Sequence, residues 1–330
     1  MSDALLFLAG LVGITFGADW LVTGSSRAAA RLGVSPLVVG LTIVAFGTSA
    51  PELFVSGLAA LRGQAGLAVG NVMGSTVANV GLIAGLGALL RPIDVKRRLL
   101  VRESPLLVFV LLIVMLLSWN SALGRLDGLA LIAGFLVYIG VMLRMEGTGV
   151  FGGELEEVLP PAVTPGEGSV RETHGESGRD KVLVQLWART FVGLVALLIG
   201  AHLLVESAVS IARAFRVPEE VIGATMVALG TSIPELASTV AAAIRGLGDI
   251  AIGNIIGSNV FNLALVLGSA ALLNPLLLPP EVVVRQVLPA LFFCIILIPL
   301  AYTGRRVNRL EGLLLLSLYG VFIWTVIWRI

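Results

Sequence analysis

The chain has 330 residues, of which 57% are hydrophobic and only 13% are charged. Soluble domains carry about 25% charged residues, and a mean hydropathy of +1.00 is too high for a water-facing surface. The composition therefore excludes a soluble enzyme and a disordered chain. The net charge of +1 provides no field that would attract a nucleic acid. The single cysteine, Cys294, excludes an internal disulfide framework. We expect an all-α membrane protein that crosses the lipid bilayer many times.

Ten apolar segments are long enough for membrane-spanning helices, which need about 20 residues each. They cover residues 4–26, 36–61, 67–90, 104–119, 126–146, 186–212, 218–244, 249–273, 282–302 and 308–328. The one polar stretch, 147–185, lies between the fifth and sixth segments. From Glu146 to Lys181 it holds eight acidic and three basic residues. We interpret it as a solvated acidic linker between two five-helix halves, 1–146 and 186–330.

The distribution of basic residues predicts the orientation. If the N-terminus lies outside, 16 of the 22 Lys and Arg residues fall in loops on the inner side and 6 fall outside. Because cytoplasmic loops are rich in Lys and Arg, both termini are expected outside and the linker in the cytoplasm. The protein would then be a multi-pass protein of the cell (inner) membrane.

The chain contains an internal repeat. Shifted by 183 residues, Val38–Leu90 aligns without a gap with Val221–Leu273, and 27 of the 53 positions are identical. One shared core reads GLTIVAFGTSAPEL from Gly40 and GATMVALGTSIPEL from Gly223. A second reads AVGNVMGSTVAN from Ala68 and AIGNIIGSNVFN from Ala251. The repeats cover about 36–90 and about 219–273. They lie five spans apart, an odd number, so the two copies are predicted to run in opposite directions, as in many secondary transporters.

The repeat places one carboxylate near the middle of the second span, Glu52, and one near the middle of the seventh, Glu235. A charge at that depth costs at least a few kcal/mol and needs a partner or a wet cavity. Neither span supplies a mid-helix Lys or Arg, so we expect the partner to be a mobile cation. Pro51 and Pro234 should break the two helices and free carbonyls around Ala45–Thr48 and Ala228–Thr231.

The other candidate ligands are also oxygen donors. Hydroxyl and amide groups recur at matching places in the two copies: Thr48, Ser49, Ser75, Asn79, Thr231, Ser232, Ser258 and Asn262. Hard cations such as Ca²⁺ and Na⁺ prefer such a set, whereas zinc or copper would prefer His or Cys. Asp19, His202 and Glu206 are weaker candidates. They are expected to be packing or interface groups near the cytoplasmic end, with an ion path or a pH sensor as the alternative.

GTSAPEL and GTSIPEL, each followed by GN-x-x-GS-x-x-x-N, resemble the two alpha repeats of the cation/calcium exchanger superfamily. The sodium/calcium exchanger branch in its short prokaryotic form is the nearest resemblance, and it covers nearly the whole chain. It implies that Glu52 and Glu235 are the central carboxylates shared by Ca²⁺ and Na⁺. It also implies backbone carbonyl ligands at Ala45 and Ala228, and flanking sodium ligands at Ser75 and Ser258.

Two positions depart from the pattern of these relatives. Many carry an aspartate where this chain has Asn79 or Asn262, so the site here has two charges, which bears on potassium co-transport and sodium stoichiometry. Relatives often have an Asn directly after the Gly-Ser pair. The second copy has this residue as Asn259, whereas the first copy has Thr76. The proton-coupled calcium branch uses a different motif around its glutamates.

The sequence therefore predicts an antiporter that exchanges cytoplasmic Ca²⁺ for external Na⁺ by alternating access, functional as a single chain and without a cofactor. Coupling to K⁺ or H⁺ is an alternative. A cation channel is less favoured, because channels build rings of ligands from several subunits. An enzyme is not expected, since the spans lack a nucleophile–base pair or an aspartyl dyad.

Overall fold

The computed structural model describes residues 2–117, 121–147, 176–215 and 228–327. Within these ranges eight helical segments are long and apolar enough to cross a membrane. They are α1 (Ser2–Leu32), α5–η2–α6 (Ala65–Ala78, Asn79–Ala84, Gly85–Leu90), η3–α7 (Leu99–Glu103, Ser104–Leu117), α8 (Arg125–Gly147), α9 (Glu176–Ala214), α13–η8–α14 (Gly248–Val260, Phe261–Val266, Leu267–Leu273), α15–η9–α16 (Pro280–Val282, Val283–Val287, Leu288–Tyr302) and α17 (Arg309–Ile327).

A ninth candidate span is a bent helix. It consists of α2 (Pro36–Val39), η1 (Gly40–Val44) and α3 (Ala45–Thr48), followed by α4 (Ala50–Leu61). The helix axis turns by 47° between Thr48 and Ala50. Of the seventh predicted span, 218–244, the structure describes only α11 (Ala228–Gly230) and the short apolar helix α12 (Ile233–Ile244). Residues 218–227 and most of the predicted linker lie outside the described residues.

Helix α9 extends beyond the apolar stretch that predicted the sixth span. We expected the sixth span to begin at residue 186, but α9 is already helical at Glu176. The predicted boundary followed the apolar stretch, whereas Arg179, Asp180 and Lys181 are compatible with a helix that continues beyond it. At 39 residues α9 is far longer than a perpendicular span requires.

The predicted breaks are confirmed. Ser49 leaves helical geometry at φ −84° and ψ 8°, and Ser232 does so at φ −90° and ψ 4°. In each case the proline that follows occupies the first turn of the next helix, where its missing N–H costs no helical hydrogen bond. The two breaks lie 183 residues apart, as the repeat requires.

The repeat extends to the secondary structure. Helices α4 and α12 are equivalent at both ends, and strand β1 (Ile93–Asp94) is equivalent to β3 (Leu276–Leu277). The π-helical turns η2 and η8 interrupt the two most deeply buried spans at positions that differ by one residue under the same shift. Such turns insert an extra residue into a helix and are frequent at functional sites.

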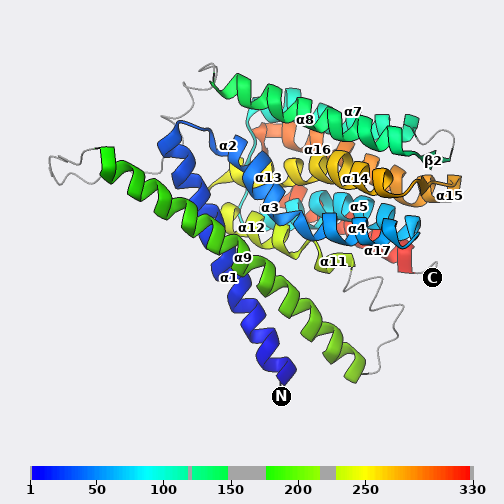
Figure 1. Ribbon diagram of the computed structural model, residues 1–330, viewed down its shortest axis with the longest axis horizontal. Helices are drawn as coiled ribbons and strands as arrows, with labels where there is room; N and C mark the ends of the chain where they lie inside the picture. Colours follow the sequence, from blue (N-terminus) through cyan, green and yellow to red (C-terminus); the bar gives the residue numbers. More distant parts are fainter. Residues whose placement is uncertain (1, 118–120, 148–175, 216–227, 328–330) are drawn as a thin grey trace.

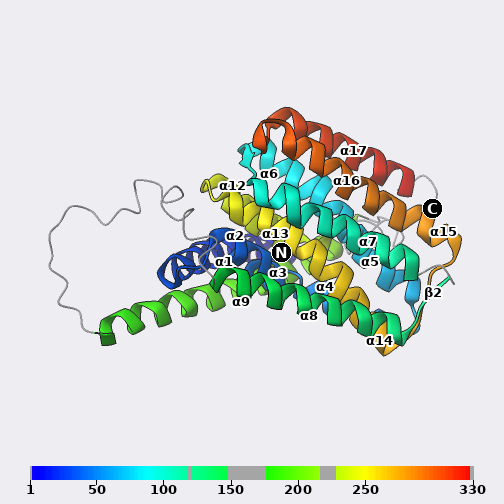
Figure 2. The ribbon, with the colours of Figure 1, turned by 90° about the horizontal axis from the view of Figure 1, so that it is seen from above.

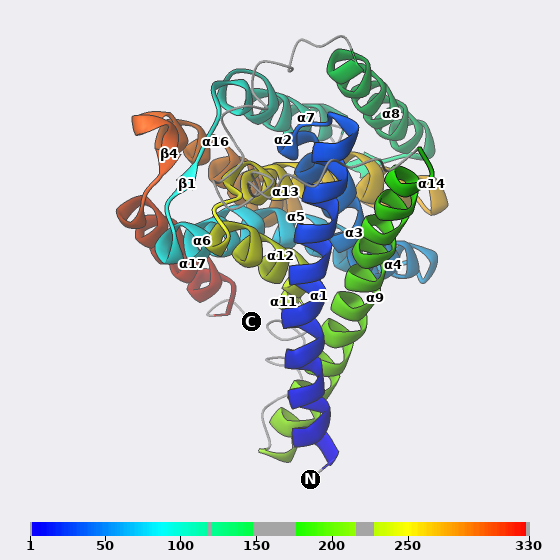
Figure 3. The ribbon, with the colours of Figure 1, turned by 90° about the vertical axis from the view of Figure 1, so that its left-hand side faces the viewer.

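Helices α1 and α9 form a pair that crosses the remaining bundle obliquely (Figures 1 and 3). Glycines allow the backbones to touch: Gly10 lies against Leu204, Gly17 against Leu197, and Gly24 against Thr190. Residue numbers rise along α1 as they fall along α9, so the two helices are antiparallel. Gly17 and Gly200 are equivalent in the repeat, so these two helices, at least, have opposite directions.

Two short sheets mark the two ends of the bundle. At the basic end, β1 pairs with β4 (Arg306–Val307), and the Val95 N–H bonds to the Arg305 carbonyl at 2.8 Å (Figure 3). A polar cavity of about 540 Å³ there joins Pro36, Lys96 and Asp249. At the opposite end β2 (Ala122–Leu123) pairs with β3, near α15 (Figure 2). The loops that the basic-residue count assigned to one side therefore meet at one end.

Candidate functional site

The two repeated glutamates lie in the first turns of the second half-helices, Glu52 in α4 and Glu235 in α12. Glu52 is 0% exposed and Glu235 1% exposed. The partial positive charge of a helix N-terminus favours a carboxylate at this position. The breaks thus place two negative groups in the interior, each next to a helix start.

Each carboxylate accepts a hydrogen bond from the opposite half of the chain. The Ser49 hydroxyl donates to Glu235 Oε1 at 2.7 Å, and the Ser232 hydroxyl donates to Glu52 Oε1 at 3.2 Å. Ser49 and Ser232 are equivalent in the repeat, as are the two glutamates. The two halves therefore exchange matching bonds, and neither half forms the site alone.

Ser75 and Ser258 break this symmetry. The Ser75 hydroxyl donates to Glu52 Oε1 at 3.3 Å and lies 3.1 Å from the Ser232 hydroxyl oxygen. The Ser258 Oγ atom is buried and has no hydrogen-bond partner among the described residues. The first copy thus brings its serine to a carboxylate, whereas the second leaves an unused buried oxygen.

Two asparagines that we did not single out from the sequence support the site. The Asn71 amide donates to Ser56 Oγ at 3.0 Å and lies 3.4 Å from the Glu52 carbonyl. The equivalent Asn254 amide donates to Thr239 Oγ1 at 2.9 Å and lies 3.4 Å from the Glu235 carbonyl. Their presence in both copies, one helical turn before the predicted serines, was the signal that could have identified them.

The predicted threonines contact these same asparagines. The Thr48 hydroxyl donates to Asn254 Oδ1 at 3.4 Å, and the Thr231 hydroxyl donates to Asn71 Oδ1 at 3.3 Å. These bonds again run between the halves. In this structure the threonine side chains therefore brace the helices that carry the glutamates.

The break does not release the Ala45 carbonyl completely, because it still accepts the Ser49 N–H at 3.0 Å. A carbonyl oxygen can accept two hydrogen bonds, and the Thr48 hydroxyl also lies 3.4 Å from this oxygen. Ala228, the equivalent residue, begins α11 directly at the edge of the described segment.

Asn79 and Asn262 lie in the π-helical turns η2 and η8. The Asn79 amide donates to Asn259 Oδ1 at 2.8 Å, and its own Oδ1 is buried without a partner among the described residues. Both polar atoms of the Asn262 side chain are likewise buried and unpartnered there. Buried amides almost always find partners, so this part of the interior has unused capacity for a polar or ionic guest.

The two glutamates also have side-chain oxygens that lack partners. Glu52 Oε2 and Glu235 Oε2 are both buried without a hydrogen-bond partner among the described residues. An unpaired buried carboxylate oxygen is costly unless a cation compensates it. The described residues contain no cluster of three or more His, Cys, Asp or Glu. The arrangement can hold a hard cation between two carboxylates and several neutral oxygens.

The weaker candidates lie elsewhere. Asp19 forms an ion pair with Arg245 and lies 3.8 Å from the Arg189 guanidinium, so it is an interface group as expected. His202 and Glu206 pair at 3.4 Å but are 76% and 68% exposed, which contradicts a packing role in this conformation.

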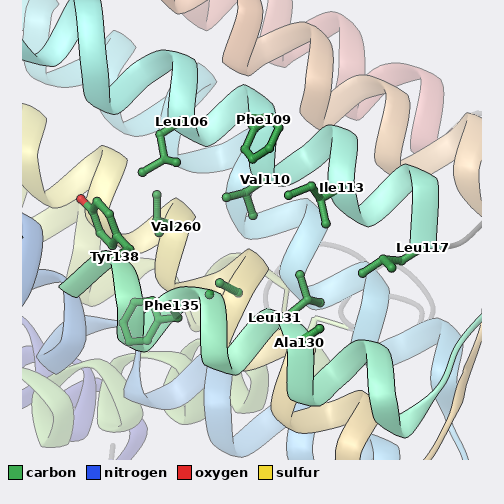
Figure 4. A pocket seen from close by; sticks show the side chains of 12 residues that line it. Leu106, Phe109, Val110, Ile113, Leu117, Ala130, Leu131, Phe135, Tyr138 and Val260 are labelled. Atoms are coloured by element: carbon green, nitrogen blue, oxygen red, sulfur yellow. The ribbon is translucent and has the colours of Figure 1, made fainter. Parts of the chain in front are cut away.

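The sequence reasoning also missed a buried charge cluster. Glu103 is 0% exposed, accepts the Tyr138 hydroxyl at 2.9 Å and lies 3.6 Å from Arg98 Nε. Tyr138 also lines an apolar cavity of about 290 Å³ between α7 and α8, whose wall is otherwise formed by groups such as Phe109, Leu117 and Val260 (Figure 4). This cavity offers no set of oxygen ligands, so it is distinct from the glutamate site.

A sequence profile of the sodium/calcium exchanger protein family matches the chain twice, over residues 2–144 and 185–328. The chain belongs to this family. The two matched segments correspond closely to the two predicted halves, and the membership confirms the resemblance inferred from the repeated motifs.

Individual relatives support the assignment. This family member is 37% identical over 323 residues to the CaxA protein of Alkalimonas amylolytica, with 97% of each chain covered. It is 34% identical over 346 residues to the sodium/calcium exchanger MaX1 of Methanosarcina acetivorans, again with 97% of each chain covered. A solved structure of the sodium–calcium exchanger NCX_Mj, soaked with Na⁺ and Sr²⁺, matches with a TM-score of 0.80 at 31% identity, covering 97% of each chain. The protein is therefore a multi-pass helical membrane protein with the exchanger fold.

Proposed function

We propose that this protein is a cation/Ca²⁺ antiporter that exchanges cytoplasmic Ca²⁺ for external Na⁺ across the cell (inner) membrane. Both ions would compete for one site built on Glu52 and Glu235. The family membership supports antiport, and MaX1 and NCX_Mj are both named sodium/calcium exchangers.

The observation that carries the site assignment is the pair of orphan carboxylate oxygens. Glu52 Oε2 and Glu235 Oε2 are buried and unpartnered, while their Oε1 atoms are held by serines from the opposite half. Ca²⁺ takes 6–8 oxygen ligands, and the neighbouring hydroxyls, amides and Ala45 carbonyl are available to add to the carboxylates. Two carboxylates balance one Ca²⁺ or two Na⁺ in charge.

Competition for these oxygens would couple the two ions. A site that carries two uncompensated negative charges is expensive to expose to the membrane interior. The carrier would therefore change its facing side readily only when the site is loaded. This penalty suppresses movement of the empty carrier. Transport of Ca²⁺ in one direction then requires transport of Na⁺ in the other.

For the architecture we propose ten spans arranged as two inverted five-helix halves, with both termini outside. The antiparallel α1–α9 pair, the matching breaks at Ser49 and Ser232 and the equivalent strands β1 and β3 support it. Alternating access would then move the α1–α9 pair against the core that carries the glutamates.

Coupling to K⁺ or H⁺ in place of Na⁺ is the second candidate. Two neutral amides, Asn79 and Asn262, stand where a third carboxylate would add a charge, which favours Na⁺ alone. A channel is disfavoured because serines of the two halves of one chain complete the carboxylate site.

The test is uptake of ⁴⁵Ca²⁺ into proteoliposomes that carry an outward gradient of Na⁺, K⁺ or H⁺ in turn, with ionophores clamping the other gradients. We expect uptake with the Na⁺ gradient alone. Uptake that needs K⁺ or H⁺ would transfer the protein to the second candidate, and uptake without any counter-gradient would indicate a channel.

A further inference from the structure

One ion pair connects the α1–α9 pair to the core. Asp19, on α1, forms an ion pair with Arg245, which caps the C-terminus of α12. Helix α12 carries Glu235 near its other end. On its other side Asp19 faces Arg189 of α9 at 3.8 Å, and the Arg189 guanidinium lies 5.8 Å from the centre of the Trp20 ring. Of these two charged contacts of Asp19, the one with Arg245 is therefore the one that joins the α1–α9 pair to the core.

The repeat assigns an equivalent to each partner. Arg62, at the C-terminus of α4, corresponds to Arg245. His202 corresponds to Asp19, and Glu206 lies one helical turn beyond it on α9. Arg62 is exposed and makes no ion pair with any residue that the structure describes, while His202 and Glu206 are exposed and contact each other. The same elements are thus latched in one half and separate in the other.

The helix packing around these groups differs between the halves in the same way as the ion pairs do. Helix α1 packs along α12, whereas α9 makes at most marginal contact with α4. On α4, Phe54 is 79% exposed and Leu58 49% exposed. Their equivalents on α12, Ala237 and Ala241, are partly buried. One end of the interface is therefore closed, and its counterpart is open.

We propose that Asp19 and Arg245 form a latch that closes the basic end of the exchanger, and that Arg62 and Glu206 form the corresponding latch in the opposite-facing conformation. In an inverted-repeat transporter the second conformation arises when the two halves exchange their local arrangements. That exchange brings α9 onto α4 and the Glu206 carboxylate toward Arg62, while α1 leaves α12. The inference rests on the alternating access proposed above.

The test uses two reporter cysteines in a Cys294→Ser background, Ala241→Cys near the closed latch and Leu58→Cys at the equivalent open position. Purified protein in detergent is labelled with a small uncharged thiol reagent. An exposed ion pair shifts an equilibrium by roughly two- to five-fold. Asp19→Asn should raise the labelling rate of the Ala241→Cys reporter by about that factor and lower that of the Leu58→Cys reporter.

The Arg62→Gln and Glu206→Gln variants should shift the same two rates in the reverse direction. The double variant Asp19→Asn/Arg245→Gln should shift them no further than either single change, because both remove one interaction. Arg189→Gln is the matched control. Its side chain also faces Asp19 but moves with α1, so both rates should stay near those of the unmodified background.

Labelling that rises at both reporters would identify Asp19–Arg245 as a structural contact only and overturn the latch. Unchanged rates in the Arg62 and Glu206 variants would overturn the second latch. The labelling requires no transport, so it is independent of the proteoliposome assay. If exchange is absent there, the proposed function fails, whatever the labelling shows.

Discussion

At the residue scale, the main feature of the site is that side chains of each half form hydrogen bonds with the glutamate and asparagine of the other half. Ser49 serves Glu235 and Ser232 serves Glu52, while Thr48 and Thr231 hold the asparagines of the opposite copy. A movement of one half relative to the other must therefore change both carboxylates together. This connects the geometry of the proposed ion site directly to the relative position of the halves.

Replacing either glutamate with glutamine tests the carboxylate pair. Glu52→Gln and Glu235→Gln keep the side-chain size and one acceptor oxygen but remove a charge. Loss of a charged ligand is worth up to about 3 kcal/mol, so we expect exchange to fall by roughly 100-fold in the ⁴⁵Ca²⁺ assay. Thermal stability in detergent should not fall, because an uncompensated buried charge has gone.

Glu103→Gln is the matched control for that experiment. Glu103 is equally buried, but it pairs with arginines and Tyr138. Removing one partner of a buried ion pair is destabilising. The variant should therefore have a lower Tm and an unchanged dependence on Na⁺ and Ca²⁺. Normal exchange in either Glu52→Gln or Glu235→Gln would refute the carboxylate site.

The asparagines missed in the sequence provide a second residue-scale prediction. Asn254→Ala removes donors to Thr239 Oγ1 and Ser238 Oγ, at 2.9 and 3.0 Å. With about 1 kcal/mol for each lost hydrogen bond, we expect apparent Ca²⁺ affinity to fall roughly ten-fold, measured as the concentration for half-maximal uptake. Thr76→Val, which removes only a bond to the Val72 carbonyl within the same helix, should leave affinity unchanged. Equal effects in both variants would indicate general destabilisation.

At the element scale, the site depends on helices that approach unusually closely. Gly257 of α13 faces the Leu41 backbone, where an added Cβ would lie 2.7 Å from the Leu41 Cα and 2.9 Å from the Ala45 Cβ. The neighbouring Gly253 similarly faces the Leu37 carbonyl. These contacts fix the position of Ser258, on α13, relative to the α2–η1–α3 segment that precedes the break at Ser49.

Gly257→Ala should therefore separate α13 from the Leu41–Ala45 segment. Overpacking of a tight interface costs about 1–3 kcal/mol, so we expect a lower Tm and at least a several-fold weaker Ca²⁺ uptake. Gly320→Ala, on the outer helix α17 with open space around it, is the control and should behave like the unmodified protein. An unaffected Gly257→Ala exchanger would show that this approach is not needed for transport.

Much of this level follows from sequence. The breaks at Ser49 and Ser232 were predictable because Pro51 and Pro234 remove a donor at a fixed place. The exchange of hydrogen bonds between halves was not, because it depends on which buried surfaces meet after folding. Asn71 and Asn254 were not predicted, although both copies of the repeat carry them, because their partners lie on other helices. The Glu103 cluster was not predicted, because it has no counterpart in the repeat and most of the candidate residues were repeated groups.

At the scale of the whole molecule, the loops sort into two ends. The β1–β4 sheet and the polar cavity lie at the end that carries Lys96, Arg97 and Arg305. The β2–β3 sheet lies at the other. This grouping agrees with alternate loops sharing a side, and the absolute orientation, like the ten-span inverted architecture, is a proposal.

Cysteine labelling in intact cells tests that orientation. In a Cys294→Ser background, Arg97→Cys lies at the basic end and Gln64→Cys at the opposite end, and both positions are exposed. Because basic loops stay in the cytoplasm, a membrane-impermeant thiol reagent should label the Gln64→Cys protein several-fold faster than the Arg97→Cys protein. Permeabilised cells, in which both should react, are the control. The reverse order in intact cells would invert the proposed topology while leaving the relation between the halves intact.

The charge of the loaded carrier leads to the last prediction. With Asn79 and Asn262 neutral, the two glutamates balance one Ca²⁺ or two Na⁺. If a third Na⁺ binds among the remaining hydroxyl and carbonyl oxygens, the Na⁺-loaded carrier bears one positive charge, and each cycle moves one charge across the membrane. We expect this three-to-one exchange, so Ca²⁺ uptake into Na⁺-loaded liposomes should increase severalfold when an ionophore clamps the interior positive. Asn262→Asp puts a carboxylate where both polar atoms of the amide side chain are buried and unpartnered among the described residues, and a nearby negative charge attracts cations and protons. Its Na⁺ dependence should change and K⁺ should begin to affect flux, whereas the control Asn308→Asp, at the basic end and away from the site, should match the unmodified protein. Flux that ignores the membrane potential would establish electroneutral two-to-one exchange and rule out the third Na⁺.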